Sequence, residues 1–152
     1  MILLEYPGIN GLTTAGQYKN CLLLSSINFG IGREGGVVNR SSSTGRTFGS
    51  KMCDPITVSR EQDHASTELI NQALLSKVQK AKIYFLETGN RCKLEITLTD
   101  CLINKINISA HGGGDHIHES FYLTFTEIEY RSIPLTGSPR GSGFNLVTGE
   151  GA

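Results

Sequence analysis

The residues with the clearest capacity for chemistry lie in one short stretch, HGGGDHIHE, which begins at His111. It holds three of the four histidines of the chain, His111, His116 and His118, together with Asp115 and Glu119. Imidazole nitrogens and carboxylate oxygens are ligands that zinc accepts. Three consecutive glycines are also typical of a turn between two strands, where polar residues face water. The spacing is no specific metal signature, so we interpret the stretch as a turn and keep a metal-binding β-barrel as the alternative.

Two other patterns resemble catalytic or cofactor motifs. The glycines of Gly30–Gly35 match the dinucleotide-binding fingerprint, and Asp54 follows at a suitable distance. That mechanism requires a helix beginning at the third glycine, and the residues that follow are glycine, valine, serine and threonine. His64 stands beside Asp63, but no nucleophile with a recognisable motif accompanies this pair. We therefore predict that the protein has no cofactor and is not an enzyme.

Composition narrows the functional classes further. The chain has 152 residues, with 14 Lys and Arg against 14 Asp and Glu, so its formal net charge is zero. A neutral chain has no electrostatic attraction to nucleic acid or to an anionic membrane, and it has little barrier to self-association. No apolar run is long enough to span a bilayer, and the N-terminus lacks the features of a signal peptide. We expect synthesis and folding in a cytosol and any export without a cleaved signal. The four cysteines form no CxxC pair, so we expect reduced thiols.

Most apolar runs have the alternating pattern of strands. The longest, 93–109, has the length of strands that wrap around a barrel or project beyond it. In 120–130 the apolar phase changes after Phe125, which predicts a bulge or a strand that passes from one sheet to another. The strands expected from these patterns are 2–6, 21–31, 56–60, 81–87, 93–109, 120–130 and 144–147.

A single segment, 63–80, has helical periodicity. Its apolar stripe must pack against the sheet, and its members are Ala65, Leu69, Ile70, Ala73, Leu74 and Val78. Two segments are poor in core residues: an extended Gly/Ser-rich loop over 33–55, and a flexible linker with a short final strand over 135–152. We predict one domain, 1–152: an antiparallel β-barrel or sandwich of two sheets with one packed amphipathic helix.

Several segments together resemble the Hcp proteins, the hemolysin-coregulated proteins of bacterial type VI secretion. The segment SREQDHASTELINQAL is similar to the place where the family's helix begins, and the residues from Leu94 to Tyr130 resemble its paired long strands. The earlier SINFGIGRE and the final GFNLVTGEGA match the family's aromatic-glycine segments less closely. The matching positions are Arg60, Asp63, Ala65, Ser66, Leu69, Leu74, Glu119, Ser120, Ile128, Tyr130, Phe29, Gly30 and Phe144.

The resemblance implies a structural role. Hcp proteins form hexameric rings that stack into a tube inside a contractile sheath, tipped by a valine-glycine repeat spike. The tube is expelled into a target cell with effectors in its lumen. We therefore expect a secreted tube subunit. A phage-derived tail tube protein and a monomeric cargo carrier are the alternatives. Ring contacts are heterologous, and the candidates in the loop and hairpin are Arg33, Val37, Val38, Arg46, Phe48, His111 and His116.

A first prediction concerns the histidines themselves. If the glycine-rich stretch is a turn, replacing His116 and His118 by asparagine removes no essential ligand. Negative-stain images of the double variant should then show the same particles as the unchanged chain. Loss of those particles would show that the histidines have a role beyond the turn.

Overall fold

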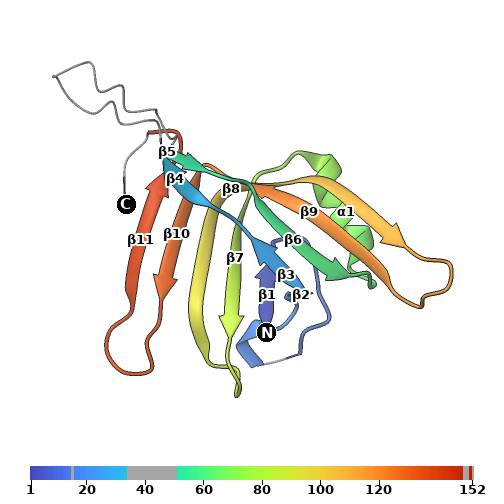
Figure 1. Cartoon of the computed structure of the whole chain (residues 1–152), viewed down its shortest axis with the longest axis horizontal. Coiled ribbons are helices and arrows are strands. Elements are labelled where there is room, and N and C mark those ends of the chain that lie inside the picture. Colours follow the sequence, from blue (N-terminus) through green and yellow to red (C-terminus); the bar gives the residue numbers. More distant parts are fainter. Residues whose placement is uncertain (15, 34–50, 149–150, 152) are drawn as a thin grey trace, which may run out of the picture.

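The computed structural model describes residues 1–14, 16–33, 51–148 and 151. Strands dominate this part of the chain, with a single α-helix, which confirms the mainly β prediction. Nine of the strands form one antiparallel sheet and two more, β4 and β5, form a separate ribbon (Figure 1). In chain order the elements are β1 (Ile2–Glu5), the 3-10 turn η1 (Gly16–Tyr18), β2 (Leu22–Leu24), β3 (Ser26–Asn28), β4 (Ile31–Arg33), β5 (Lys51–Cys53), β6 (Ile56–Glu61), α1 (Ser66–Leu75), β7 (Gln79–Leu86), β8 (Cys92–Ala110), β9 (Ile117–Thr124), β10 (Glu127–Ser132) and β11 (Arg140–Asn145).

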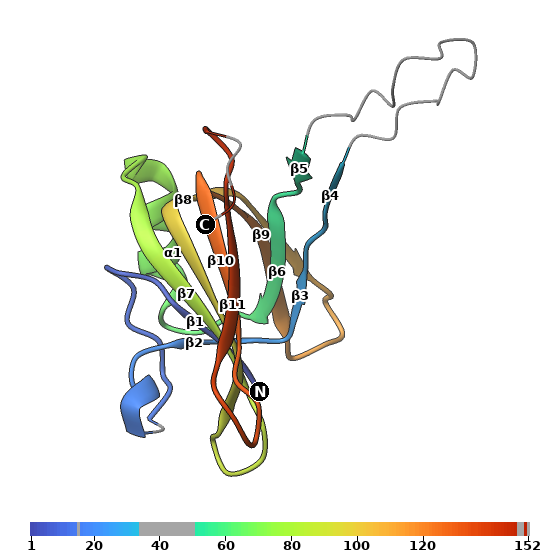
Figure 2. The ribbon, with the colours of Figure 1, turned by 90° about the vertical axis from the view of Figure 1, so that its left-hand side faces the viewer.

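The long strand β8 belongs to both layers of a sandwich. Its first half pairs with β7 on one side and β10 on the other, and its second half pairs with β9. Layer A therefore contains β2, β1, β7, β10 and β11 with the first half of β8. Layer B contains β9, β6 and β3 with the second half. Figure 2 shows the two layers side by side, with the chain from β2 to β3 crossing between them.

Irregular backbone at two points lets β8 change layers. Asp100 and Lys105 have φ angles of 51° and 46°, in the left-handed region that side chains rarely adopt. Before Asp100 the buried aliphatic side chains stand at even-numbered positions, Ile96 and Leu98. After Asp100 the buried side chains stand at odd-numbered positions, Cys101 and Ile103. Unbroken alternation would place Leu102 in the core with Ile96 and Leu98, but Leu102 is only partly buried, because each irregularity displaces the alternation by one residue.

The returning strand changes layers at the same place. Phe121, Leu123 and Phe125 are buried in layer B, and Ile128 is buried in layer A. Between them, the amide of Thr126 donates a 3.0 Å hydrogen bond to the carbonyl of Thr99. The predicted passage of this segment from one sheet to the other is confirmed. One long hairpin thus joins the layers on this side.

Helix α1 begins at a buried polar network. The Arg60 guanidinium, 1% exposed, lies 2.8 Å from Glu119 Oε2 on β9 and 2.6 Å from Asp63 Oδ2. It also donates to the Ser66 hydroxyl at 3.2 Å, and Asp63 Oδ1 accepts the amide of Ala65. This network binds the end of β6, the first turn of α1 and the start of β9 together.

The helix is shorter than the expected 63–80. It ends at Leu75, Ser76 takes a left-handed conformation with φ of 52°, and Gln79 already belongs to β7. The expectation that the whole apolar stripe packs against the sheet was wrong. Ala65 and Leu69 are buried. Four aliphatic side chains further along the segment are exposed, three on the helix and one after it: Ile70, Leu74, Leu75 and Val78. Within the described residues, no helix is long and apolar enough to cross a membrane.

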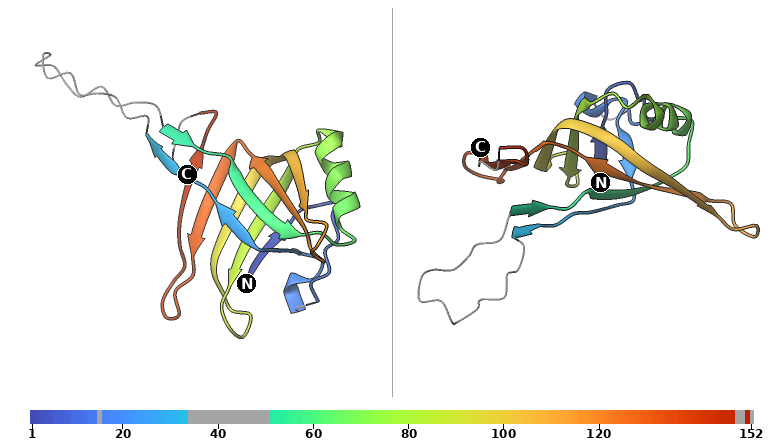
Figure 3. Two further views of the ribbon diagram at one scale, coloured as in Figure 1. Left: turned by 45° about the vertical axis from the view of Figure 1, so that its right-hand side comes forward. Right: turned by 90° about the horizontal axis from the view of Figure 1, so that it is seen from above.

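The Gly/Ser-rich loop expected over 33–55 contains strand residues near both of its ends, and the final strand expected in the tail begins earlier than predicted. Residues at both ends of the Gly/Ser-rich segment pair as β4 with β5, a ribbon that points away from the body (Figure 3). In the tail, β11 runs over Arg140–Asn145 rather than 144–147 and pairs with β10. The tail thus adds a strand to the edge of layer A.

The Arg60 network predicts a large stability loss on substitution. In Arg60→Met, the Glu119 side chain loses its cationic partner in a site where the residue is 2% exposed. Breaking a buried pair on one side costs about 3–5 kcal/mol. Urea unfolding should show this loss for Arg60→Met and a change below about 0.5 kcal/mol for the exposed control Arg131→Met. Equal stability of the two variants would contradict the structural role of the network.

Cysteine reactivity gives a second measurement of the core. Burial raises the pKa of the Cys101 thiol to about 12, and burial followed by the charge of Glu5 raises the pKa of Cys21 to about 11. Because the thiolate is the nucleophile, both thiols should be alkylated at least about tenfold more slowly at pH 8 than the half-buried Cys92. Mass spectrometry of iodoacetamide-treated native protein measures the rates. Raising the pH through these pKa values, or adding urea, should increase the alkylation rate of both thiols. Rapid alkylation of Cys101 in the native protein would contradict this account.

Candidate functional site

The glycine-rich stretch forms the tip of the β8–β9 hairpin, which projects from the body (Figure 1). The amide of Gly114 donates to the carbonyl of His111 at 3.0 Å and closes the turn. His116 Nδ1 lies 2.5 Å from Glu61 Oε1 at the end of β6, and both side chains are more than half exposed. His118 is in register with Glu61 on the neighbouring strand. The hairpin is therefore attached to β6 at its base.

The histidines do not gather as metal ligands. His116 faces a carboxylate, and His111 lies at the far end of the turn. In the described part of the chain, no three His, Cys, Asp or Glu side chains come close enough together to hold a metal ion. The arrangement is that of an exposed polar hairpin in which His116 contacts the carboxylate of Glu61.

The predicted contact residues of the Gly/Ser-rich segment can be placed only in part. The backbone of Arg33 ends β4, the first strand of the projecting ribbon. Its side chain and the residues Val37, Val38, Arg46 and Phe48 lie outside the described residues. What the structure does place is the direction of the ribbon, which leaves the body at the end away from the β8–β9 hairpin (Figure 3).

An exposed apolar face on α1 is a feature that the sequence prediction missed. Leu74 is 77% exposed and Leu75 63%, and Ile70 and Val78 are also exposed, although all four are aliphatic. Exposed apolar side chains that lie next to one another on a soluble protein mark interaction sites. The signal in the sequence was an apolar stripe longer than the helix that packs on the core. Periodicity alone does not say how much of a stripe the core covers.

The comparisons with known proteins agree with the fold. The chain matches one family model, described as the type VI secretion system effector Hcp, over residues 3–131. A search of curated proteins finds no match.

Solved structures resemble the chain over nearly its whole length. Hcp1 from Salmonella typhimurium is 19% identical with a TM-score of 0.82, and the match covers 99% of this chain and 97% of that one. A type VI secretion system effector from Yersinia pestis is 14% identical with a TM-score of 0.77, covering 95% and 99%. A further structure, described as a type six secretion system protein, is 18% identical with a TM-score of 0.88, covering 99% and 98%. With a family model that spans most of its length and a fold shared with these structures, the chain belongs to the Hcp family of the type VI secretion system.

Proposed function

We propose that this chain is the structural subunit of a type VI secretion tube, in which hexameric rings stack and carry effectors in the lumen. The observation that carries the proposal is a group of exposed aliphatic side chains, Ile70, Leu74 and Leu75 on α1 and Val78 just after it. A subunit that functioned alone would leave these side chains in water, and burying them against a neighbouring subunit is favourable by about 25 cal/mol for each square ångström covered.

The sheet and its projections also suit a repeated assembly. Layer A ends at two different strands, β2 and β11, each of which pairs on only one side with described strands. Because the two edges and the two projections of the molecule differ, contacts between identical copies can be heterologous, as a ring requires. The zero net charge removes long-range repulsion between copies.

The remaining contacts of the assembly follow from the family. The residues proposed for ring and stacking contacts are Arg33, Val37, Val38, Arg46, Phe48, His111 and His116. We assign a spike of the valine-glycine repeat type, the contractile sheath and luminal effectors as partners, with no catalytic role for the chain. In this scheme the subunit waits in the bacterial cytoplasm and leaves the cell when the tube is expelled, without a cleaved signal peptide.

Assembly of the unchanged protein tests the proposal directly. Negative-stain images should show six-fold rings, and light scattering at micromolar concentration should give the mass of a hexamer. A stable monomer over a range of salt concentrations would contradict the tube function.

The Leu74→Glu variant tests the helix face. Leu74 is exposed in the isolated subunit, so the change should leave the free energy of unfolding, measured in urea, within about 0.5 kcal/mol of the original value. Burying the new carboxylate in an interface is unfavourable, so rings should give way to monomers. Leu135→Glu is the matched control, because Leu135 is 81% exposed between β10 and β11. Intact rings in Leu74→Glu would remove α1 from the interface, while the images of the unchanged protein would still decide the tube function.

A further inference from the structure

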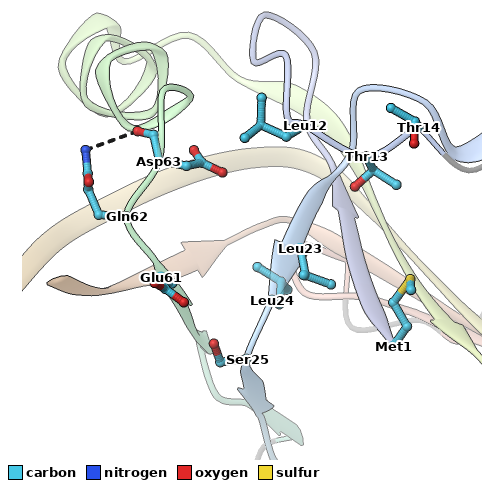
Figure 4. Close-up of a pocket in the computed structure, with 10 residues that line it drawn as sticks. All are labelled: Met1, Leu12, Thr13, Thr14, Leu23, Leu24, Ser25, Glu61, Gln62 and Asp63. Carbon is cyan, nitrogen blue, oxygen red and sulfur yellow. Dashed lines mark hydrogen bonds between the residues drawn. The ribbon is translucent and has the colours of Figure 1, made fainter. Parts of the chain in front are cut away.

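A hollow of about 710 Å³ opens at the surface beside β2. Its walls come from three places in the chain: the loop before η1, the strand β2, and the end of β6 with the turn that follows it (Figure 4). The volume falls in the range of about 300–1,000 Å³ that is typical of binding pockets. The hollow is therefore large enough to receive several side chains of another molecule.

The walls of the hollow are held in place by the fold. The Thr13 hydroxyl donates to the carbonyl of Cys21 at 2.7 Å, and a Cβ at Gly11 would collide with that carbonyl, so the close approach requires glycine. On the opposite wall, Asp63 Oδ2 lies 2.6 Å from the Arg60 guanidinium. The hollow is therefore formed before a partner arrives.

The backbone at both ends of β2 is already hydrogen-bonded. The carbonyl of Cys21 accepts the Thr13 hydroxyl, and the amide of Ser25 donates to the carbonyl of Ser59 at 2.8 Å. Because β2 itself contains only three residues, these bonds leave little backbone for an added strand. A partner in this hollow is therefore recognised through its side chains.

The lining combines exposed aliphatic side chains with one available carboxylate. Leu12 and Leu23 are 61% and 56% exposed. No lysine or arginine is among the described lining residues. Glu61 is more than half exposed, and within the described chain its ion-pair partner is the equally exposed His116. The hollow thus suits a group that presents aliphatic side chains together with a cation.

The C-terminal end of α1 is such a group. Leu74, Leu75 and Val78 are 77%, 63% and 48% exposed. Lys77 stands between them in the sequence, is exposed, and forms no ion pair with the residues that the structure describes. We call these four residues the α1 end. Their aliphatic side chains and their cation complement the two leucines and the carboxylate of the hollow.

Within one copy the α1 end and the hollow are separate surfaces. None of the four residues of the α1 end lines the hollow. The loop that carries Leu12 contacts a different side of the helix, because the amide of Asn10 donates to Glu68 Oε2 at 2.5 Å and Gln72 lies against Gly8. A copy can therefore offer its α1 end to one neighbour and its hollow to another, which is the arrangement that a heterologous contact requires.

We propose that the α1 end of one copy docks in the hollow of the next copy, an inference that rests on the tube function proposed above. Leu74 and Leu75 contact the two exposed leucines of the hollow, and the ammonium of Lys77 pairs with the carboxylate of Glu61. The occupant is a second copy because the chain itself carries both complementary surfaces, apolar against apolar and cation against carboxylate. Each copy donates one surface and accepts with the other.

Two blocked variants test the contact. Leu12→Lys places a cation in the hollow, where it repels Lys77, so this variant should be a monomer, as should Leu74→Glu. Leu12 is exposed, so the urea midpoint of Leu12→Lys should be unchanged. Leu135→Lys is the matched control, since Leu135 is exposed and belongs to neither surface, and it should keep the rings.

An equimolar mixture of the two blocked variants shows whether the surfaces lie on opposite sides of the contact. The Leu74→Glu copy keeps a working hollow and the Leu12→Lys copy keeps a working α1 end, so one contact can form and no further copy can be added. Light scattering at up to about 1 mM protein should give the mass of a dimer, where each variant alone gives a monomer. A mixture that stays monomeric would overturn the proposal.

A charge exchange tests the ion pair. Glu61→Lys and Lys77→Glu should each raise the protein concentration at which the rings half-dissociate about fivefold, and the two changes in one chain should reverse this loss. Lys80→Glu is the matched control for Lys77→Glu, because Lys80 is also exposed and lies beyond the α1 end. Combined with Glu61→Lys, it should give no recovery. Equal recovery with both lysine variants, or with neither, would overturn the pairing of Lys77 with Glu61.

The outcomes separate this contact from the tube function. Rings that persist in Leu12→Lys would overturn the contact and leave the tube function standing. A monomeric unchanged protein would overturn both.

Discussion

The buried guanidinium of Arg60 fixes the relative positions of β6, α1 and β9, on which the rest of the fold depends. Its guanidinium is almost fully removed from water and bonds Glu119 on β9, Asp63 before the helix and Ser66 in the first helical turn. Buried ion pairs contribute little net stability compared with apolar residues of the same size, but removing one partner is costly. The network therefore favours one arrangement of β6, α1 and β9 over its alternatives. The residues that carry the family resemblance around the helix start are the same residues that build this network.

The second constraint is that the two layers share one strand. Because β8 pairs with β7 and β10 in its first half and with β9 in its second, neither layer has a complete set of strands without it. Tyr6 reinforces the crossing point, since its hydroxyl donates to the carbonyl of Cys101 from the start of the chain. The projecting hairpin and the centre of layer A consequently share one continuous strand. The positions of the exposed surfaces relative to one another follow from this shared strand.

Much of the fold was predictable because local patterns and tertiary environment agree there. The phase change after Phe125 is a direct record of a strand that buries opposite faces in two layers, and alternation identified β6 and β7. The predictions failed where the burial of a residue depends on which other elements of the fold pack against its segment. Leu74 has the same apolar character as Leu69, yet only Leu69 faces the core. In β8, the left-handed residues Asp100 and Lys105 displace the alternation, and the strand contains no glycine that would have indicated these irregularities. The hollow lined by Leu12, Leu23 and Glu61 (Figure 4) escaped prediction because its walls come from segments far apart in the chain.

The pairing of the first strand with a late one has a consequence for synthesis of the protein. β1 lies between β2 and β7, and the terminal amine of Met1 bonds to the carbonyl of Leu86. When the N-terminal half leaves the ribosome, layer A consists of the β1–β2 hairpin alone, and an isolated two-stranded hairpin is marginally stable in water. Layer A gains its central strand only when β8 emerges, and such long-range pairing makes folding slow. The nascent chain therefore carries open strand edges while these residues are translated, and layer A is complete only after β10 and β11 have emerged.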